Sequence, residues 1–228
     1  MKRGWLIVFA KAPRPGLVKT RMSPPLGLDQ AAELYEAMLA DVLDASARFA
    51  AELDLEPVLA VHPPDAVAEM VGRAPPSFRL QVQKGLGLAE RMANAFAEAV
   101  AAGAPFALLR GSDSPALDQT QIEVAKLQLE GGTDVVLTPD GGGGYAMVGQ
   151  KAAEPRLFEV PMSTDDMIDR TVSLCADLGL AVHETKPTFD LDGVDDLQAV
   201  ESLPSGRASD LCPRTVEAIA DLRHRGVL

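Results

Sequence analysis

The N-terminal segment of this chain concentrates positive charge that could bind phosphate. Residues 1–21 contain six basic side chains and no acidic one, although the whole chain of 228 residues has a net charge of −12. Four of the six lie in one loop shaped by proline and glycine: Lys11, Arg14, Lys19 and Arg21. Arginine can bind phosphate oxygens through two parallel hydrogen bonds and lysine neutralises them as a point charge, so the loop suits a polyphosphate. The alternative is a loop whose charges face water, and the P-loop pattern G-x-x-x-x-G-K-[ST] is absent.

Two acidic elements could hold a divalent cation. Asp113 follows the uncharged segment Phe106–Leu109, and a carboxylate at the end of a buried strand suits a hard cation such as Mg²⁺. Asp190 and Asp192 are two residues apart, so in an extended segment they point to the same side. Close carboxylates repel one another unless a cation lies near them, and a metal shared with Asp113 would relieve that repulsion. The alternatives are a helix cap at Asp113 and a solvated acidic turn at the second pair.

Glycines mark two further loops. Gln83 precedes a turn containing Gly85 and Gly87, where the backbone can approach a flat ligand and Gln83 could hydrogen-bond a base edge. A plain strand-to-helix turn is the alternative. The run Gly141–Gly144 before Tyr145 could wrap an acceptor or form a hairpin turn. The three histidines are far apart and the G-x-S-x-G pattern is absent, so the sequence does not support a Ser/His/Asp or Cys/His hydrolase.

These residues follow short apolar segments that alternate with amphipathic ones. Period-two and short apolar patterns predict strands at residues 5–10, 57–61, 78–82, 106–109, 134–137, 145–148, 181–183 and 188–191. Helical spacing predicts helices at residues 29–50, 65–71, 86–102, 118–129, 163–178 and 215–223, the last within a C-terminal helical segment of about 214–226. The segment 206–213 is expected to be a loose linker to that helix.

Alternating strands and helices predict an α/β fold, with a mostly parallel sheet covered on its two faces. We expect one domain spanning residues 1–228. Such sheets bind ligands beyond the carboxyl ends of their strands, which directs attention to the residues after Ala10, Val82, Leu109 and Leu137.

Composition and charge exclude several classes of partner. Hydrophobic residues make up 47% of the chain, and two cysteines are too few for a disulfide framework. No segment approaches the roughly 18 apolar residues of a membrane span, so we expect no membrane insertion and a cytoplasmic location. The acidic balance argues against nucleic acid, because phosphates repel it. Residues 1–21 nevertheless have a net charge of +6 and the remaining residues one of −18. A small polyphosphate could therefore lie between the basic loop and a metal held by some of the acidic residues.

The order of these motifs resembles a bacterial family in the nucleotide-diphospho-sugar transferase (GT-A) superfamily. The resemblance begins at F-A-K-A-P-R-P-G-L-V-K-T-R, residues Phe9–Arg21. It continues through Ala32–Asp41, Gly85–Met92, Gly111–Leu117, Gly143–Gly149, Ser163, Thr164 and Asp190–Leu197. Members are described as glycosyltransferases of the arsenosugar-biosynthesis type or as radical-SAM-associated transferases. A more distant similarity links the chain to the nucleotidyltransferases that make molybdopterin dinucleotide and coenzyme F420 precursors.

The resemblance implies a single-domain, Rossmann-like, three-layer GT-A fold and a transferase dependent on Mg²⁺ or Mn²⁺. Its partners would be a nucleotide or nucleotide sugar and a small-molecule acceptor. It implies nucleotide binding by Ala10, Lys11, Arg14, Lys19, Arg21, Gln83, Gly85 and Leu88. It implies metal binding by Asp113, Asp190 and Asp192, and catalytic roles for Asp113, Lys19 and Asp192. It places the acceptor near Gly143, Gly144, Tyr145, Ser163 and Thr164.

The chain departs from the family pattern at three positions. Ser114 stands where the family usually has Cys, Gly142 where it has Asp, and Met162 where it has Trp. Three functions therefore stand side by side: glycosyl transfer from a nucleotide sugar, nucleotidyl transfer from a nucleoside triphosphate with release of pyrophosphate, and nucleotide binding without catalysis. The missing acidic residue at Gly142 is the main support for the third. The second resembles guanylyltransferases and cytidylyltransferases.

Overall fold

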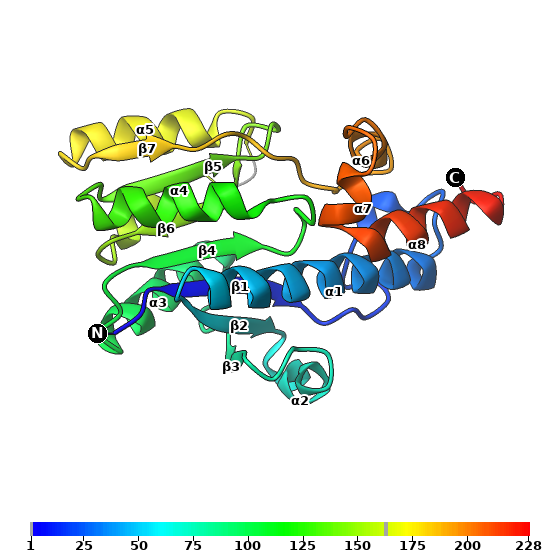
Figure 1. Ribbon diagram of the computed structural model, residues 1–228, viewed down its shortest axis with the longest axis horizontal. Coiled ribbons are helices and arrows are strands. Elements are labelled where there is room, and N and C mark those ends of the chain that lie inside the picture. The colour runs from blue at the N-terminus through cyan, green and yellow to red at the C-terminus, as the bar shows by residue number, and fades with distance from the viewer. Residues whose placement is uncertain (1, 162–163) are drawn as a thin grey trace.

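The protein is built around a mixed sheet, seen in a computed structural model that describes residues 2–161 and 164–228 (Figure 1). The sheet order is β3-β2-β1-β4-β6-β5-β7, and only β6 runs antiparallel to its neighbours among the described strands. The strands are β1 (Trp5–Lys11), β2 (Glu56–His62), β3 (Arg79–Val82), β4 (Ala107–Gly111), β5 (Val135–Pro139), β6 (Tyr145–Gln150) and β7 (Val182–Glu184). The main helices are α1 (Leu28–Glu52), α2 (Val67–Val71), α3 (Leu88–Ala101), α4 (Gln119–Glu130) and α5 (Met167–Asp177).

Helices cover the two faces of the sheet because alternate strand residues are apolar on each side. Trp5, Ile7 and Phe9 of β1 pack with residues of α3 and α5 and with the short helix η3 (Pro155–Phe158). Leu6 packs instead with α4 and the end of α1, and Val8 packs with the middle of α1. This period of two is the geometry of a strand buried on both faces. The predicted fold class, an α/β sheet between two helical layers, is confirmed.

The C-terminal part packs against the N-terminal half of α1 and not on the sheet (Figure 1). It consists of α6 (Leu197–Glu201), α7 (Arg207–Leu211) and α8 (Pro213–His224). The buried carboxylate of Asp41 in α1 accepts hydrogen bonds from the backbone N–H groups of Arg214 and Thr215, at 3.2 and 2.8 Å. A negative charge is favourable at a helix N-terminus, so Asp41 fastens α8 to α1.

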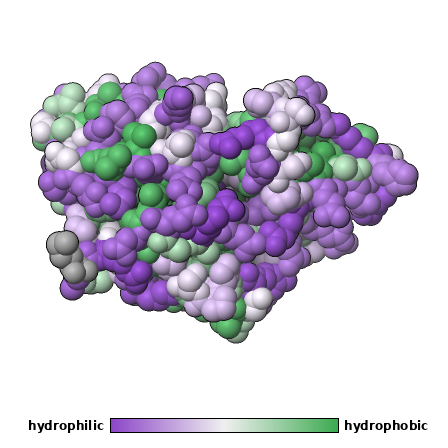
Figure 2. All heavy atoms as spheres, viewed as in Figure 1, coloured by the Kyte–Doolittle hydropathy of each residue, from purple (hydrophilic) through white to green (hydrophobic). Residues whose placement is uncertain are grey.

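The strand order places a topological switch between β1 and β4. The chain moves from β1 outward through β2 and β3, then returns to the other side of β1 with β4. At such a point the loops after the two central strands diverge and leave a crevice at their carboxyl ends. In Figure 1 these ends point toward α6 and α7, and Figure 2 shows the outline notched between the sheet layers and α6.

Three sequence expectations differ from the structure. Residues 188–191 form no strand, because their backbone bonds go to two separate elements: Thr188 N donates to Pro139 O at the end of β5, and Leu191 N donates to Asp113 O in the loop after β4. The expected linker at 206–213 contains α7 and the first residue of α8. The short helices η1 (Thr20–Met22), η2 (Pro64–Ala66), η3 and α6 were not predicted as separate elements, since one turn of helix leaves too little periodicity to detect. Predicted strands and long helices otherwise agree within a few residues.

Candidate functional site

An ion-pair cluster lies at the switch point. The ammonium group of Lys19, from the loop after β1, pairs with Oδ1 of Asp113, from the loop after β4, and with Oδ1 of Asp192 at 3.2 Å. The Lys19 side chain is only 3% exposed, whereas those of Asp113 and Asp192 are 40% and 48% exposed. The cation is therefore enclosed by protein while its two carboxylates face solvent. Burial alone would lower the pKa of Lys19, but the two carboxylates outweigh it and the pKa is raised.

Local hydrogen bonds hold these loops close to one another. Lys19, the residue just before η1, has a left-handed backbone with φ of 47°, which is uncommon for a residue other than glycine. The buried Tyr35 hydroxyl contacts Ser112 Oγ at 2.8 Å and both backbone polar groups of Lys11, so it joins the loops after β1 and β4. The bond from Leu191 N to Asp113 O, 2.9 Å long, brings the third acidic segment to the same place.

Arg21 is the more exposed cation of the cluster. Its guanidinium contacts Oδ2 of Asp192 at 3.2 Å, and its side chain is 72% exposed. Surface ion pairs of this kind contribute roughly 0–1 kcal/mol, so Arg21 can leave Asp192 for a phosphate at small cost.

Next to the cluster, three buried or partly buried polar residues are linked by hydrogen bonds. Asp190 Oδ1 accepts a hydrogen bond from Ser114 Oγ, and the backbone O of Ser114 accepts one from the buried Arg110 at 2.6 Å. Burial raises the pKa of Asp190 to about 7, with the charges of Asp113 and Asp192 acting in the same direction and the Ser114 bond opposing them. Burial likewise lowers the pKa of Arg110 to about 10. With a pKa of about 7, the Asp190 carboxyl group is partly protonated at neutral pH.

A fourth acidic residue, Asp140, was not predicted. It lies just after β5, and its charge also raises the pKa of Asp190, which places it near the group. Its Oδ1 atom accepts the backbone N–H groups of Gly142 and Gly144 at 2.7 and 3.0 Å. The sequence signal was available, since Asp140 follows the predicted strand 134–137 and stands only two residues before Gly142, where the family has its acidic residue.

The predicted base-binding residues lie at the neighbouring strand ends. Gln83, after β3, donates through Nε2 to the backbone O atoms of Ala10 and Ala60, at 3.1 and 2.9 Å. These two acceptors fix the orientation of the amide, so contact with a ligand would fall to Oε1. Gly85 has φ of +133°, and a Cβ there would lie 2.9 Å from the backbone N of Arg91, so the turn requires glycine. Leu88 begins α3 and is exposed.

Some predicted residues are not joined to this cluster. Arg14 instead contacts Asp65 on η2 at 2.8 Å and Glu69 on α2 at 3.1 Å, and these partners raise its pKa. Tyr145, predicted on the acceptor side, packs against the core and its buried hydroxyl has no hydrogen-bond partner among the described residues.

The other predicted acceptor-side residues lie in or beside loops next to α5. Gly143 O accepts the backbone N–H of Ile168 in α5 at 2.8 Å. Thr164 Oγ1 donates to Pro161 O at 3.3 Å, while Ser163 and the Met162 departure lie outside the described residues.

The donor set suits a cation that arrives with a ligand of its own. Within the part of the chain that the structure describes, no three His, Cys, Asp or Glu side chains are arranged to hold a metal. Asp113 and Asp192 nevertheless direct oxygen atoms at one point, where the Lys19 ammonium lies. Mg²⁺ commonly takes one or two protein carboxylates and completes its shell with water and substrate phosphates. These two residues fit that pattern more directly than Asp190, whose Oδ1 is taken by Ser114.

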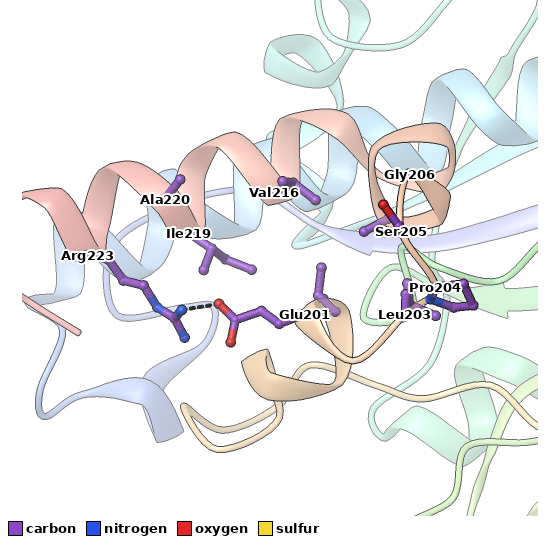
Figure 3. A pocket seen from close by; sticks show the side chains of 11 residues that line it. Glu201, Leu203, Pro204, Ser205, Gly206, Val216, Ile219, Ala220 and Arg223 are labelled. Carbon is purple, nitrogen blue, oxygen red and sulfur yellow. Dashed lines mark ion pairs between the residues drawn. The ribbon is translucent and has the colours of Figure 1, made fainter.

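A separate groove of about 310 Å³ lies among the C-terminal helices (Figure 3). Val216, Ile219 and Ala220 of α8 form one side of it, and an ion pair between Arg223 and Glu201 lies at one end. None of its lining residues belongs to the predicted site. Strand ends and converging charges, not this apolar groove, therefore locate the candidate site.

Among the described residues, every helix is too short or too polar to cross a bilayer.

Comparison with known families identifies the chain at the level of a family. Residues 45–164 match the bacterial family described as "Uncharacterized protein conserved in bacteria (DUF2064)". The chain belongs to this family. The matched segment includes Gln83, Asp113, Asp140 and Tyr145, while Lys19 and Asp192 lie outside it. No curated protein matches the chain.

Solved structures extend the similarity over the whole chain. A proposed nucleotide-diphospho-sugar transferase from Desulfovibrio desulfuricans G20 is 28% identical, with a TM-score of 0.84 over 98% of each chain. A 4-diphosphocytidyl-2C-methyl-D-erythritol synthase is 16% identical, with a TM-score of 0.57 over 88% of this chain and 97% of its own. CMP:2-keto-3-deoxy-manno-octonic acid synthetase, solved with CTP, is 10% identical, with a TM-score of 0.51 over 88% and 98%. These likenesses agree with the predicted fold class, and the last two concern the fold alone.

Proposed function

We propose that this protein is a transferase that acts on a nucleotide-activated donor and requires Mg²⁺ or Mn²⁺. The observation that carries the proposal is the meeting of Lys19, Asp113 and Asp192 at the β1–β4 switch point. That position is where open α/β sheets bind ligands, and the residue types are those that bind a metal-bound polyphosphate. The similarity to a proposed nucleotide-diphospho-sugar transferase supports the same assignment.

In the proposed complex each group of the site has a separate task. Asp113 and Asp192 hold the cation, which when bound stabilises negative charge on the departing phosphate groups. Arg21, already exposed and weakly paired, moves to the phosphates. Gln83 and the turn at Gly85 face the base, which is supported by the hydrogen bond from Gln83 to the backbone of Ala10 in β1. No covalent enzyme intermediate is needed.

Glycosyl transfer from a nucleotide sugar is the reaction that we favour. The acceptor would attack the anomeric carbon, and the bond from that carbon to the nucleoside diphosphate would break. We place a small-molecule acceptor on the side of Gly143, Gly144 and Thr164, as the resemblance to arsenosugar-type transferases implies. Asp140, whose carboxylate binds the backbone of this same glycine loop, supplies an acidic residue two positions before Gly142.

Nucleotidyl transfer is the second candidate, favoured by the shared fold of the two cytidine-nucleotide enzymes. Here a phosphorylated acceptor would attack the α-phosphorus of a nucleoside triphosphate and pyrophosphate would leave. Release of pyrophosphate in the presence of a triphosphate and phosphorylated small acids would support this reaction. Slow hydrolysis of a nucleotide sugar without pyrophosphate release would support glycosyl transfer.

Thermal denaturation with nucleotides tests the proposed function directly. A ligand present at 100 times its Kd stabilises a protein by about 2.7 kcal/mol, which raises Tm by about 5–10 °C in a chain of this size. We expect such a shift from at least one nucleotide or nucleotide sugar with Mg²⁺, and a smaller one with EDTA. Asp113→Ala should remove the metal-dependent part, whereas Asp195→Ala, an exposed acid in the same loop as Asp192, should retain it. Equal, metal-independent shifts in the three proteins would contradict the assignment.

A further inference from the structure

The ammonium group of Lys19 fills the place that a metal ion would take in the site. Its ammonium group lies between Oδ1 of Asp113 and Oδ1 of Asp192, the two oxygens that converge on one point. A divalent cation bound by both oxygens would occupy the place that the ammonium group fills. Even a cation bound beside it, through the outer carboxylate oxygens, would be repelled by a positive charge only one carboxylate away.

We propose that Lys19 acts as a built-in competitor that weakens the binding of free divalent cations, so that the metal binds tightly only together with a polyphosphate. This inference rests on the proposed function, because it concerns the same carboxylates. It assigns to Lys19 a regulatory role in addition to phosphate binding.

The reason lies in what Lys19 loses when a metal displaces it. The side chain is 3% exposed, and the two carboxylates are its charged partners in the structure. A free cation that took Asp113 and Asp192 would leave the ammonium group enclosed and without a counter-charge, which is strongly unfavourable. A metal that arrives on a polyphosphate also brings phosphate oxygens, and Lys19 can then exchange its carboxylate partners for them. Metal and nucleotide therefore bind with positive coupling, and each increases the affinity for the other by the same factor.

Arg21 offers a matched comparison within the same cluster. It also contacts Asp192, through Oδ2 at 3.2 Å, but its side chain is 72% exposed and water can take the place of the carboxylate. Removing Arg21 removes a screened charge from the surface, whereas removing Lys19 removes the enclosed charge between the two ligands. The two variants lose the same formal charge and differ in where it lay.

Binding of Mn²⁺ to the whole protein, followed by electron paramagnetic resonance of free Mn²⁺, tests the proposal without an activity assay. In wild type we expect weak Mn²⁺ binding that tightens at least tenfold when CTP or GTP is added, whichever gives the larger thermal shift. In Lys19→Met we expect Mn²⁺ alone to bind at least tenfold more tightly than in wild type, with the dependence on nucleotide reduced. Arg21→Met should change Mn²⁺ affinity by less than threefold. Adding Asp113→Asn to Lys19→Met should abolish the gain.

The outcomes separate this inference from the proposed function. If Lys19→Met binds Mn²⁺ no more tightly than wild type, the competition is refuted even where nucleotides bind. If no nucleotide binds to any variant, the proposed function fails, and the Mn²⁺ gain in Lys19→Met still decides whether the ammonium group competes for the carboxylates. Circular dichroism and thermal melts establish that the variants fold. Should Lys19→Met not fold, Lys19→Gln, which keeps a hydrogen-bond donor, serves in the same comparison with the same expected direction.

Discussion

Asp190 makes the stability of the protein depend on pH in a direction opposite to that of most carboxylates. Its folded-state pKa is about 7, and the ordinary value is 3.8. A carboxyl group with a raised folded pKa favours the folded state below its unfolded pKa, and that contribution is lost as pH rises through the folded pKa. We therefore expect the contribution of Asp190 to the free energy of unfolding to fall between about pH 4 and pH 7. Three pKa units correspond to at most about 4 kcal/mol.

Asp190→Asn isolates this effect. The asparagine side chain has nearly the same shape and keeps an oxygen that can accept the bond from Ser114 Oγ, but it cannot ionise. Urea unfolding should be measured at pH 5, 6, 7 and 8. The free energy of unfolding of the variant minus that of wild type should increase by up to about 1.4 kcal/mol per pH unit, and this difference should level off above pH 7. Glu217→Gln, an exposed change in the middle of α8, is the matched control and should show no such trend. A gap that stays constant over this range would refute the reasoning.

Two further substitutions test the loops that carry the site. Tyr35→Phe removes the hydroxyl that joins Ser112 to the first loop, so urea unfolding should show a loss of about 1–3 kcal/mol, and a loss below about 0.5 kcal/mol would contradict the role of Tyr35. Gly143 has a φ of +93°, and in Gly143→Ala the added Cβ would lie against the backbone of Asp165. We therefore expect the free energy of unfolding to fall by at least about 1–2 kcal/mol in the same assay. Gly142→Ala, which has more room and no positive φ, should be tolerated, and equal losses in the two alanine variants would contradict this account.

Much of the fold follows from local pattern in the sequence. The apolar run of β1 and the helical spacing in α1 and α3 predicted elements that the structure has, because burial on one or two faces imposes a period on each. The position of β6 between β4 and β5, antiparallel to both, could not be read in this way. Strand order depends on which edges meet in three dimensions, and period carries no information about that.

The candidate site was predictable as a set of residues but not as an arrangement. Lys19 was chosen as part of a basic loop, Asp113 for its place after an apolar segment, and Asp192 for its spacing from Asp190. The structure brings the three into contact. No signal in the sequence predicts that Lys19 is enclosed, or that it binds the same carboxylates that are expected to hold a metal. Arg110 was missed for a related reason: an arginine at a strand end ordinarily reaches solvent, yet here it is fully buried beneath Ser114.

The pairing of Lys19 with Asp192 joins residues that are 173 positions apart. On a ribosome, the loop after β1 emerges early, while the acidic segment that completes the cluster emerges only after β7. An incomplete nascent chain therefore exposes Lys19 without its second carboxylate, and cannot yet present the assembled site to a nucleotide. Closing so long a loop is costly in chain entropy, so we expect this corner to be among the last parts to order and among the first to open.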